Sequence, residues 1–148
     1  MPEFSGLSVA IASDHAGFEL KEQLRAWMAE RGVQVTDLGP SDAASTDYPE
    51  YAHRLARDVV GGGVQLGVLV CGTGLGMSMA ANRHAGVRAA VCTDPFAARM
   101  TRQHNDANVL CLGSRIIGAG LAEDILHAFL SAEFEGGRHA RRVEKIEL

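Results

Sequence analysis

The chain has 148 residues, of which 47% are hydrophobic and 22% charged, and its formal net charge is −4. This length and composition exclude a disordered chain and predict one globular domain over residues 1–148, with enough apolar side chains for a core. The slight acidic excess argues against a nucleic-acid partner, because a protein that binds nucleic acid gathers basic residues on one face.

Targeting and redox signals are weak. The first residues, MPEFSGLSV, lack a charged segment followed by a long apolar run, so we expect no signal peptide, and no apolar run approaches the length of a membrane span. The three cysteines, Cys71, Cys92 and Cys111, are far apart and form no CxxC pair, which favours free thiols over disulfides or a zinc site. The sequence therefore predicts a cytoplasmic protein without a membrane partner.

Short apolar runs alternate along the chain with longer amphipathic segments. The predicted strands are residues 7–13, 34–39, 66–72, 87–93 and 108–114. The predicted helices are residues 18–31, 48–61, 75–83, 95–104 and 119–131, and a last helix in the tail EGGRHARRVEKIEL. Gly32 follows the first helix at a position typical of a left-handed cap.

This alternation predicts an α/β fold, with a parallel sheet, helices on both of its faces and right-handed crossovers. Ligands of such sheets bind beyond the carboxyl ends of the strands. The polar residues expected at that edge are Ser13, Asp14, His15, Cys71, Thr93, Asp94, Ser114 and Arg115.

The stretch LVCGTGLGMS, residues 69–78, places three alternate glycines between the third strand and a helix. Gly72, Gly74 and Gly76 would let backbone amides approach a ligand, and the helix start would add partial positive charge, which suits a phosphate or a developing oxyanion. The alternative is a tight turn without a ligand. A dinucleotide site is disfavoured, because its GxGxxG motif follows the first strand, whereas here GxGxG follows the third.

Cys71 ends the strand before this glycine loop. A thiol beside a helix N-terminus is expected to carry more thiolate near neutral pH, and it could then act as a nucleophile or as a general base. The alternative is an inert buried thiol, which is the prediction for Cys92 and Cys111.

Two histidines have open interpretations at this stage. Asp14 and His15 either line a cleft as a polar pair or serve as a helix cap and a surface histidine. His104, with Asn105 and Asp106 beside it, either interacts with a helix C-terminus or transfers protons.

Arginines in the tail also allow two interpretations. Arg138 and Arg142 are four residues apart, so on a helix they share a face and either clamp a phosphate or form a solvated basic face. His53, His84 and His127 are predicted to be structural or surface residues.

Five motifs together resemble the ribose-5-phosphate isomerase B family, which includes the galactose-6-phosphate isomerase subunits. The motifs are ASDHAGFELK, TDYPEYA, CGTGLGMSMAAN, RQHNDANVLCLGSR and EGGRHARRV, and they extend from about Val9 to Val143. The resemblance implies a Rossmann-like three-layer α/β/α sandwich with a five-stranded parallel sheet and a C-terminal helix. It also implies a homodimer or tetramer with active sites shared across the interface, and a reaction that needs no metal or organic cofactor.

The activity that the resemblance implies is aldose–ketose isomerisation of a sugar phosphate through a cis-enediolate. Cys71 would be the base between C1 and C2, Thr73 would assist proton movement on the oxygens, and His104 would open the sugar ring from the neighbouring subunit. The implied substrate-binding residues are Asp14 and Tyr48 for hydroxyls, Gly72, Gly74, Leu75 and Gly76 for the enediolate, Asn105, and His15, Arg115, Arg138 and Arg142 for the phosphate.

The substrate implied first is ribose 5-phosphate, converted to ribulose 5-phosphate in the pentose phosphate pathway. Allose 6-phosphate, galactose 6-phosphate and a tetrose phosphate such as erythrulose 4-phosphate are alternatives. One branch of the family uses a glutamate further along the loop, but Leu75 and Met77 offer no carboxylate here, which favours the cysteine branch. Outside this activity, a non-catalytic phosphate-binding module and a thiol enzyme with a covalent adduct at Cys71 stay open.

Overall fold

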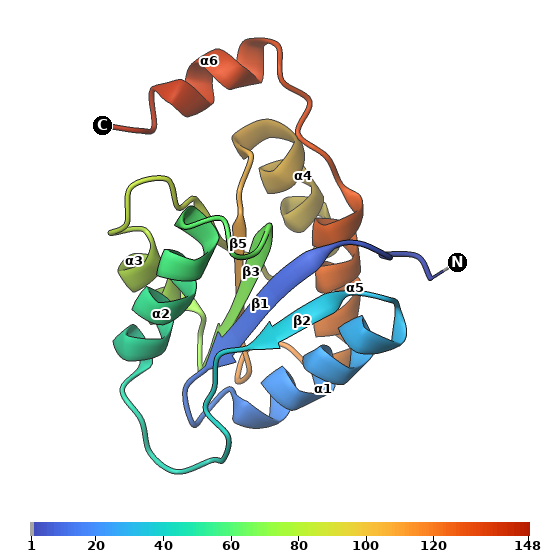
Figure 1. Ribbon diagram of the computed structural model, residues 1–148, viewed down its shortest axis with the longest axis vertical. Helices are drawn as coiled ribbons and strands as arrows, with labels where there is room; N and C mark the ends of the chain where they lie inside the picture. The colour runs from blue at the N-terminus through green and yellow to red at the C-terminus, as the bar shows by residue number, and fades with distance from the viewer. Residues whose placement is uncertain (1) are drawn as a thin grey trace.

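The computed structural model describes residues 2–148, which form one sheet of strands covered by helices (Figure 1). The strands are β1 (Ser8–Ser13), β2 (Gln34–Asp37), β3 (Leu66–Cys71), β4 (Ala89–Val91) and β5 (Val109–Gly113). The helices are α1 (Phe18–Glu30), α2 (Tyr48–Val60), α3 (Leu75–Ala81), α4 (Pro95–Asn105), α5 (Ala119–Ser131) and α6 (Arg138–Glu144).

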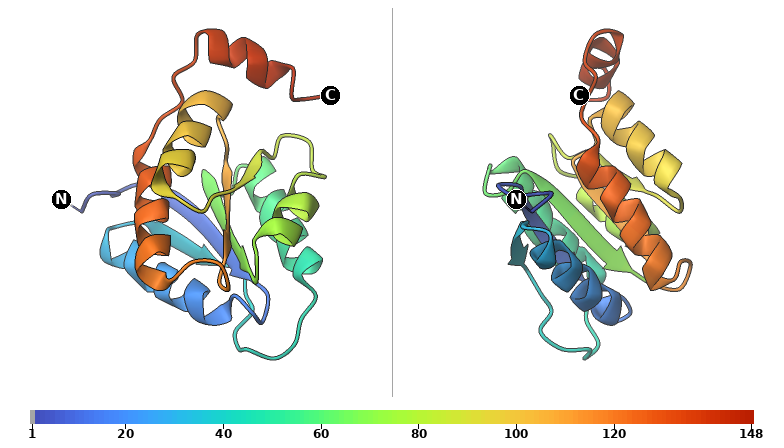
Figure 2. Two further views of the ribbon diagram at one scale, coloured as in Figure 1. Left: turned by 180° about the vertical axis from the view of Figure 1, so that it is seen from behind. Right: turned by 90° about the vertical axis from the view of Figure 1, so that its right-hand side faces the viewer.

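The five strands are all parallel, in the order β2-β1-β3-β5-β4. Successive side chains of a strand point to opposite faces, so Val9 and Ile11 of β1 enter one core and Ala10 and Ala12 enter the other. Helices α1, α4 and α5 cover the first face, and α2 and α3 cover the second (Figures 1 and 2). The three-layer α/β/α sandwich is therefore confirmed.

The predicted elements are all present, and the differences lie at their ends. Strands β2 and β4 are shorter than predicted because each lies at a sheet edge, where only one neighbour supplies hydrogen bonds. Helix α3 ends at Ala81, before the predicted boundary, because the Asn82 side chain bonds both backbone groups of Ala89 at 2.8 and 3.0 Å and turns the chain toward β4. Gly32 has φ +88°, which confirms the predicted left-handed cap.

The direction of the helices decides which residues share an end of the sheet. Helix α4 returns from the end of β4 to the start of β5, so its last turn lies at the amino ends of the strands. Helix α6 lies beyond that turn, at the opposite end of the molecule from the strand tips (Figures 1 and 2). No helix within residues 2–148 is long and apolar enough to cross a membrane.

Candidate active site

The ends of β1 and β3 bring Asp14 close to the glycine loop. Asp14 is 7% exposed, its amide donates to Val70 O at 3.2 Å, and its Oδ1 accepts from Gly17 N at 3.0 Å. A Cβ on Gly17 would lie 2.5 Å from Val70 O, so only glycine allows the two chain segments to approach this closely. The carboxyl group is thus fixed just before α1, but the N-cap itself is Gly17.

His15 is held by a residue to which the sequence analysis gave no role. Its amide donates to Thr46 Oγ1, and the Thr46 amide donates back to His15 Nδ1, both at 3.2 Å. The pair ties the end of β1 to the segment before α2. That segment leads into Tyr48, whose ring packs on the glycine loop: a Cβ on Gly76 would lie 2.5 Å from it.

Cys71 occupies the tip of β3 and is only 5% exposed. The Gly74 amide donates to Cys71 Sγ at 3.1 Å, so the loop folds back over the thiol. Gly74 adopts φ +80° and lies against Leu112, where an added Cβ would be 3.1 Å from backbone atoms. The loop geometry therefore depends on glycine at this position.

The residues after β5, the neighbour of β3 in the sheet, fix the other side of the loop. Ser114 N donates to Cys71 O at 2.8 Å, and Arg115 N donates to Gly72 O at 3.0 Å. The Arg115 side chain lies over Gly72, where an added Cβ would be 3.5 Å from its Cδ. Thr73 is exposed, and its hydroxyl accepts from Leu75 N at 3.2 Å. The predicted residues from β1, α2, β3 and β5 thus meet at one edge of the sheet.

The other two cysteines lie inside the apolar cores. Burial, with a smaller contribution from Asp94, raises the pKa of Cys92 to about 11. Burial also raises the pKa of Cys111, and the neighbouring Cys71 and Cys92 act in the same direction. Both therefore stay as neutral thiols near pH 7, in agreement with the inert role predicted for them.

A second group of predicted residues lies at the opposite end of the sheet. Cys71 pairs with Gly113, whereas β5 begins at Val109, four residues or about 13 Å away. His104 and Asn105 precede that start, at the end of α4, and the tail arginines follow on α6. A single chain therefore does not bring His104 to its own Cys71.

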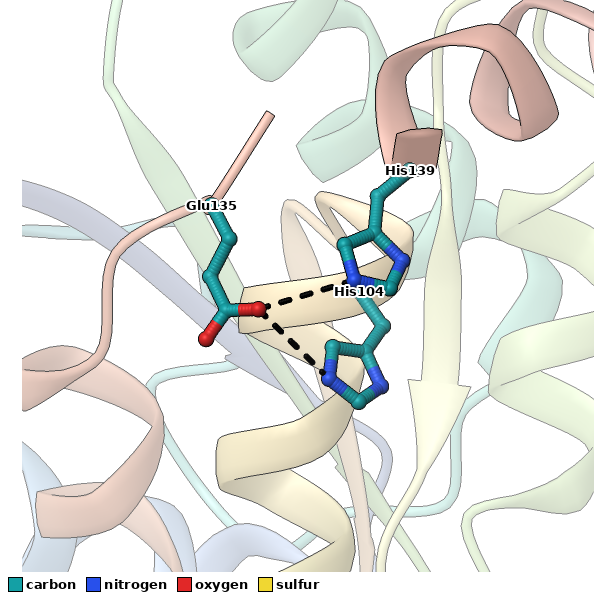
Figure 3. A group of neighbouring side chains, drawn as sticks. All are labelled: His104, Glu135 and His139. Carbon is teal, nitrogen blue, oxygen red and sulfur yellow. Dashed lines mark ion pairs between the residues drawn. The ribbon is translucent and has the colours of Figure 1, made fainter. Parts of the chain in front are cut away.

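His104 lies in a cluster with Glu135 and His139, to which the sequence analysis gave no role (Figure 3). The two imidazole rings stack with centroids 4.3 Å apart and planes 9° from parallel. Glu135 Oε1 lies 3.7 Å from His104 Nε2 and 3.5 Å from His139 Nε2. Burial lowers the pKa of His139, as do the nearby His104 and Arg138, while Glu135 opposes them.

Two histidines and a carboxylate are also ligands that suit Zn²⁺. In-plane lone pairs of parallel rings do not converge on one point, however, so a shared ion would require the His104 or His139 ring to turn. The stacked rings instead lie beside the Glu135 carboxylate at ion-pair distance.

The remaining histidines make structural contacts. His53 Nδ1 lies 2.7 Å from His84 Nε2, and His127 Nε2 lies 2.7 Å from Glu3 Oε1. Burial lowers the pKa of His84, and the nearby His53 and Arg57 act in the same direction. These contacts agree with the structural role predicted for the three histidines.

The overlooked residues all lie inside motifs that the sequence analysis quoted. Thr46 opens TDYPEYA, and Glu135 and His139 belong to EGGRHARRV. Nothing in their spacing indicates a partner, because each pairs with a residue at least 31 positions away or across a glycine turn.

The chain is similar to known proteins over nearly its whole length. The Ribose/Galactose Isomerase family model matches residues 9–146. Ribose-5-phosphate isomerase B from Escherichia coli K12 is 52% identical over 138 residues, covering 93% of each chain. D-erythrulose-4-phosphate isomerase from Pectobacterium atrosepticum is 43% identical over 141 residues, covering 95% of this chain and 93% of that one. Among solved structures, ribose-5-phosphate isomerase B from Clostridium thermocellum superimposes with a TM-score of 0.94 at 48% identity, covering 95% of each chain.

Proposed function

The chain belongs to the ribose/galactose isomerase family, and on that premise we propose that it interconverts the aldose and ketose forms of a sugar phosphate, with ribose 5-phosphate as its preferred substrate. The observation that carries the proposal is the position of Cys71. Its sulfur lies at the carboxyl edge of a parallel sheet, 3.1 Å from a loop amide and among the ends of β1, β3 and β5.

The chemistry requires a base and an oxyanion site side by side. Removing a proton from the carbon next to a carbonyl leaves negative charge on oxygen, which nearby donors must stabilise. We assign the proton transfer between C1 and C2 to Cys71, and the stabilisation of the enediolate to amides of residues 72–76. Thr73, exposed in the same loop, would move protons on the substrate oxygens.

Substrate binding uses the side chains around this loop. Asp14 keeps one carboxylate oxygen on Gly17 N and can offer the other to a sugar hydroxyl, while the Tyr48 ring borders Gly76. His15 and Arg115 would bind the phosphate. Holding that remote group fixes the carbon chain against the thiol, which lowers the entropy cost of reaching the transition state.

The residues at the other end of the sheet would act in a homodimer. His104 opens the sugar ring, and Asn105, Arg138 and Arg142 complete the substrate and phosphate sites, when they reach the Cys71 edge of a neighbouring subunit. Within one chain they lie beyond the start of β5, away from that edge. The enzyme would work in the cytoplasm. It would need no metal or organic cofactor, because the thiol and the loop amides supply both groups that the proton transfer needs.

The substrate is the part of the proposal with the strongest competitor. A relative at 43% identity is named for D-erythrulose 4-phosphate, a four-carbon sugar. The proton-transfer chemistry is the same for both, since each substrate has a carbonyl near one end and a phosphate at the other.

The decisive experiment is turnover of a substrate panel by the purified protein, with EDTA and no added metal. Ribose 5-phosphate, allose 6-phosphate, galactose 6-phosphate and erythrulose 4-phosphate are tested for aldose–ketose conversion. We expect ribose 5-phosphate to give the highest kcat/KM. Preference for another member would keep the mechanism and change the substrate, whereas no turnover of any of the four by folded protein would favour a phosphate-binding module.

A further inference from the structure

Arg88 connects two segments that are distant in sequence. Its Nη1 donates to Glu147 Oε1 at 2.7 Å, its Nε donates to Asp106 O at 2.9 Å, and its Nη2 donates to Asp106 Oδ2 at 3.3 Å. Asp106 directly follows the last turn of α4, and Glu147 lies in the tail after α6. One guanidinium therefore contacts residues that follow both of the helices carrying the second group of predicted residues.

The backbone around Arg88 is itself fixed. Arg88 N donates to Asn108 Oδ1 at 2.8 Å, and Asn108 Nδ2 donates to Gly86 O at 2.9 Å. Asp106 adopts φ +47° and also accepts from Arg102 Nη1 at 3.2 Å. Arg88 is thus anchored against the start of β5 and can hold other groups in place.

Helix α6 is attached to the rest of the molecule near its two ends. At the first, Glu135 N donates to Gln103 O at 3.0 Å and the His139 ring stacks on His104. At the second, Glu147 accepts from Arg88 and, at 3.4 Å, from Gly86 N. Figures 1 and 2 show α6 standing beyond α4, away from the sheet.

The tail arginines lie on the helix that these attachments hold, Arg138 within the first attachment and Arg142 between the first and the second. Arg138 and Arg142 are exposed, so their positions depend on how the helix is held. A seven-residue helix is too short to be stable by itself. Release of one attachment would therefore let the helix move or fray locally.

We infer that Arg88 is a positioning residue. Through Glu147 it fixes the far end of α6, and through Asp106 it fixes the end of α4. As a result the tail arginines and His104 are presented as one rigid unit. The inference rests on the proposed function, in which that unit completes the site of a neighbouring subunit.

The exposure of the Arg88–Glu147 pair predicts a small contribution to global stability. The Arg88 and Glu147 side chains are 18% and 38% exposed, and ion pairs that reach solvent contribute little to unfolding free energy. Loss of the pair should therefore leave the fold intact while the helix loses its second attachment.

The test compares Glu147→Ala, which removes the charge and the oxygens that accept from Arg88, with Glu144→Ala, a matched control that removes the same side chain from the exposed surface of α6. For Glu147→Ala we expect the KM for ribose 5-phosphate and the inhibition constant for inorganic phosphate to rise roughly tenfold. We expect kcat to stay within about twofold, and Tm to stay within about 2 °C. Amide hydrogen exchange over residues 138–145 should become faster, and the control should behave like wild type.

Unchanged KM and phosphate inhibition in Glu147→Ala would overturn the inference, and so would equal changes in both variants. If the wild type converts no sugar phosphate, the proposed function fails on its own. Hydrogen exchange then decides the structural part: faster exchange in Glu147→Ala alone supports the attachment, and equal exchange rates overturn it.

Discussion

A hydrogen-bond donor points at the sulfur of Cys71. The Gly74 amide lies 3.1 Å from Sγ, at the tip of β3 and next to the glycine loop, although Cys71, like Cys92 and Cys111, also packs against apolar side chains. Position at the sheet edge, more than burial, distinguishes the three thiols, since all are less than 6% exposed.

Replacement of Cys71 by alanine tests the base directly. We expect Cys71→Ala to lower kcat/KM by about 10²- to 10⁴-fold, the usual contribution of a general base, because no other group takes the proton from carbon. Inorganic phosphate should still bind, as measured by calorimetry. Cys92→Ala is the control and should keep near-wild-type activity; a similar loss in both variants would remove the special role of Cys71.

At the scale of elements, the glycine loop between β3 and α3 combines a strained backbone with a tight contact. Gly74 has φ +80° and lies against the Leu112 backbone. Gly62, at the end of α2, has φ +79° with no atom within 4 Å of an added Cβ. The two glycines share the backbone conformation and differ in surroundings.

Substituting these two glycines distinguishes the effect of backbone strain from the effect of a changed site geometry. Alanine at either position should destabilise the fold by about 1–2 kcal/mol through the positive φ. Only Gly74→Ala should also lower kcat/KM, by about 100-fold, since the loop must move away from Leu112 and the donor to Cys71 shifts. Urea unfolding and steady-state kinetics measure the two effects. Equal activity in both variants would show that the loop tolerates the shift.

Another contact between elements links α2 to the segment after α3. His53 Nδ1 and His84 Nε2 lie 2.7 Å apart, so one nitrogen must donate and the other must accept. Burial, then His53 and Arg57, lower the pKa of His84 from 6.5. The folded protein therefore binds this proton less tightly than the unfolded chain does.

The stability of the folded protein should therefore fall as the pH is lowered. The contact contributes fully above about pH 6.5 and loses its contribution as the pH falls below that value, because the unfolded chain then gains the proton first. Between pH 7.5 and 5.5 the Tm of the wild type should fall further than the Tm of His84→Gln, by on the order of 2 °C. The lowered pKa of His139 should decrease the Tm at low pH in both proteins. Arg83→Gln, a neighbouring charge change, should match wild type.

At the scale of the whole molecule, the candidate site is divided between the two ends of the sheet. Cys71 lies at the carboxyl edge, and His104 with the tail arginines lies beyond the amino ends of the strands. A complete site in the proposed homodimer combines one end of each subunit. Activity then depends on assembly as well as on folding.

Mixing two inactive variants tests this division. Cys71→Ala and His104→Ala, denatured together and refolded, should recover about a quarter of wild-type activity. Half of the dimers would be hybrids, each with one intact site of its two. Each variant refolded alone is the control. Recovery no greater than in the controls would place Cys71 and His104 of one site on the same chain.

The sequence by itself determined the layered fold and the Cys71 edge. Continuous apolar strands alternating with amphipathic helices leave few arrangements besides a parallel sheet covered on both faces, and such a sheet brings its strand ends to one edge. Asp14 follows β1, Cys71 is the last residue of β3, and Arg115 comes two residues after β5, so their convergence could be predicted from order alone.

Only the tertiary structure decided the contacts made by residues outside strand ends. The Thr46 bond to His15, the stacking of His139 on His104 and the Arg88 contact to Glu147 join segments whose relative placement depends on how loops and the tail pack. Hydrophobic periodicity encodes which face of an element is buried, but not which polar side chains meet across a turn. The separation of His104 from Cys71 follows from the direction of α4, which is fixed once the strands are parallel.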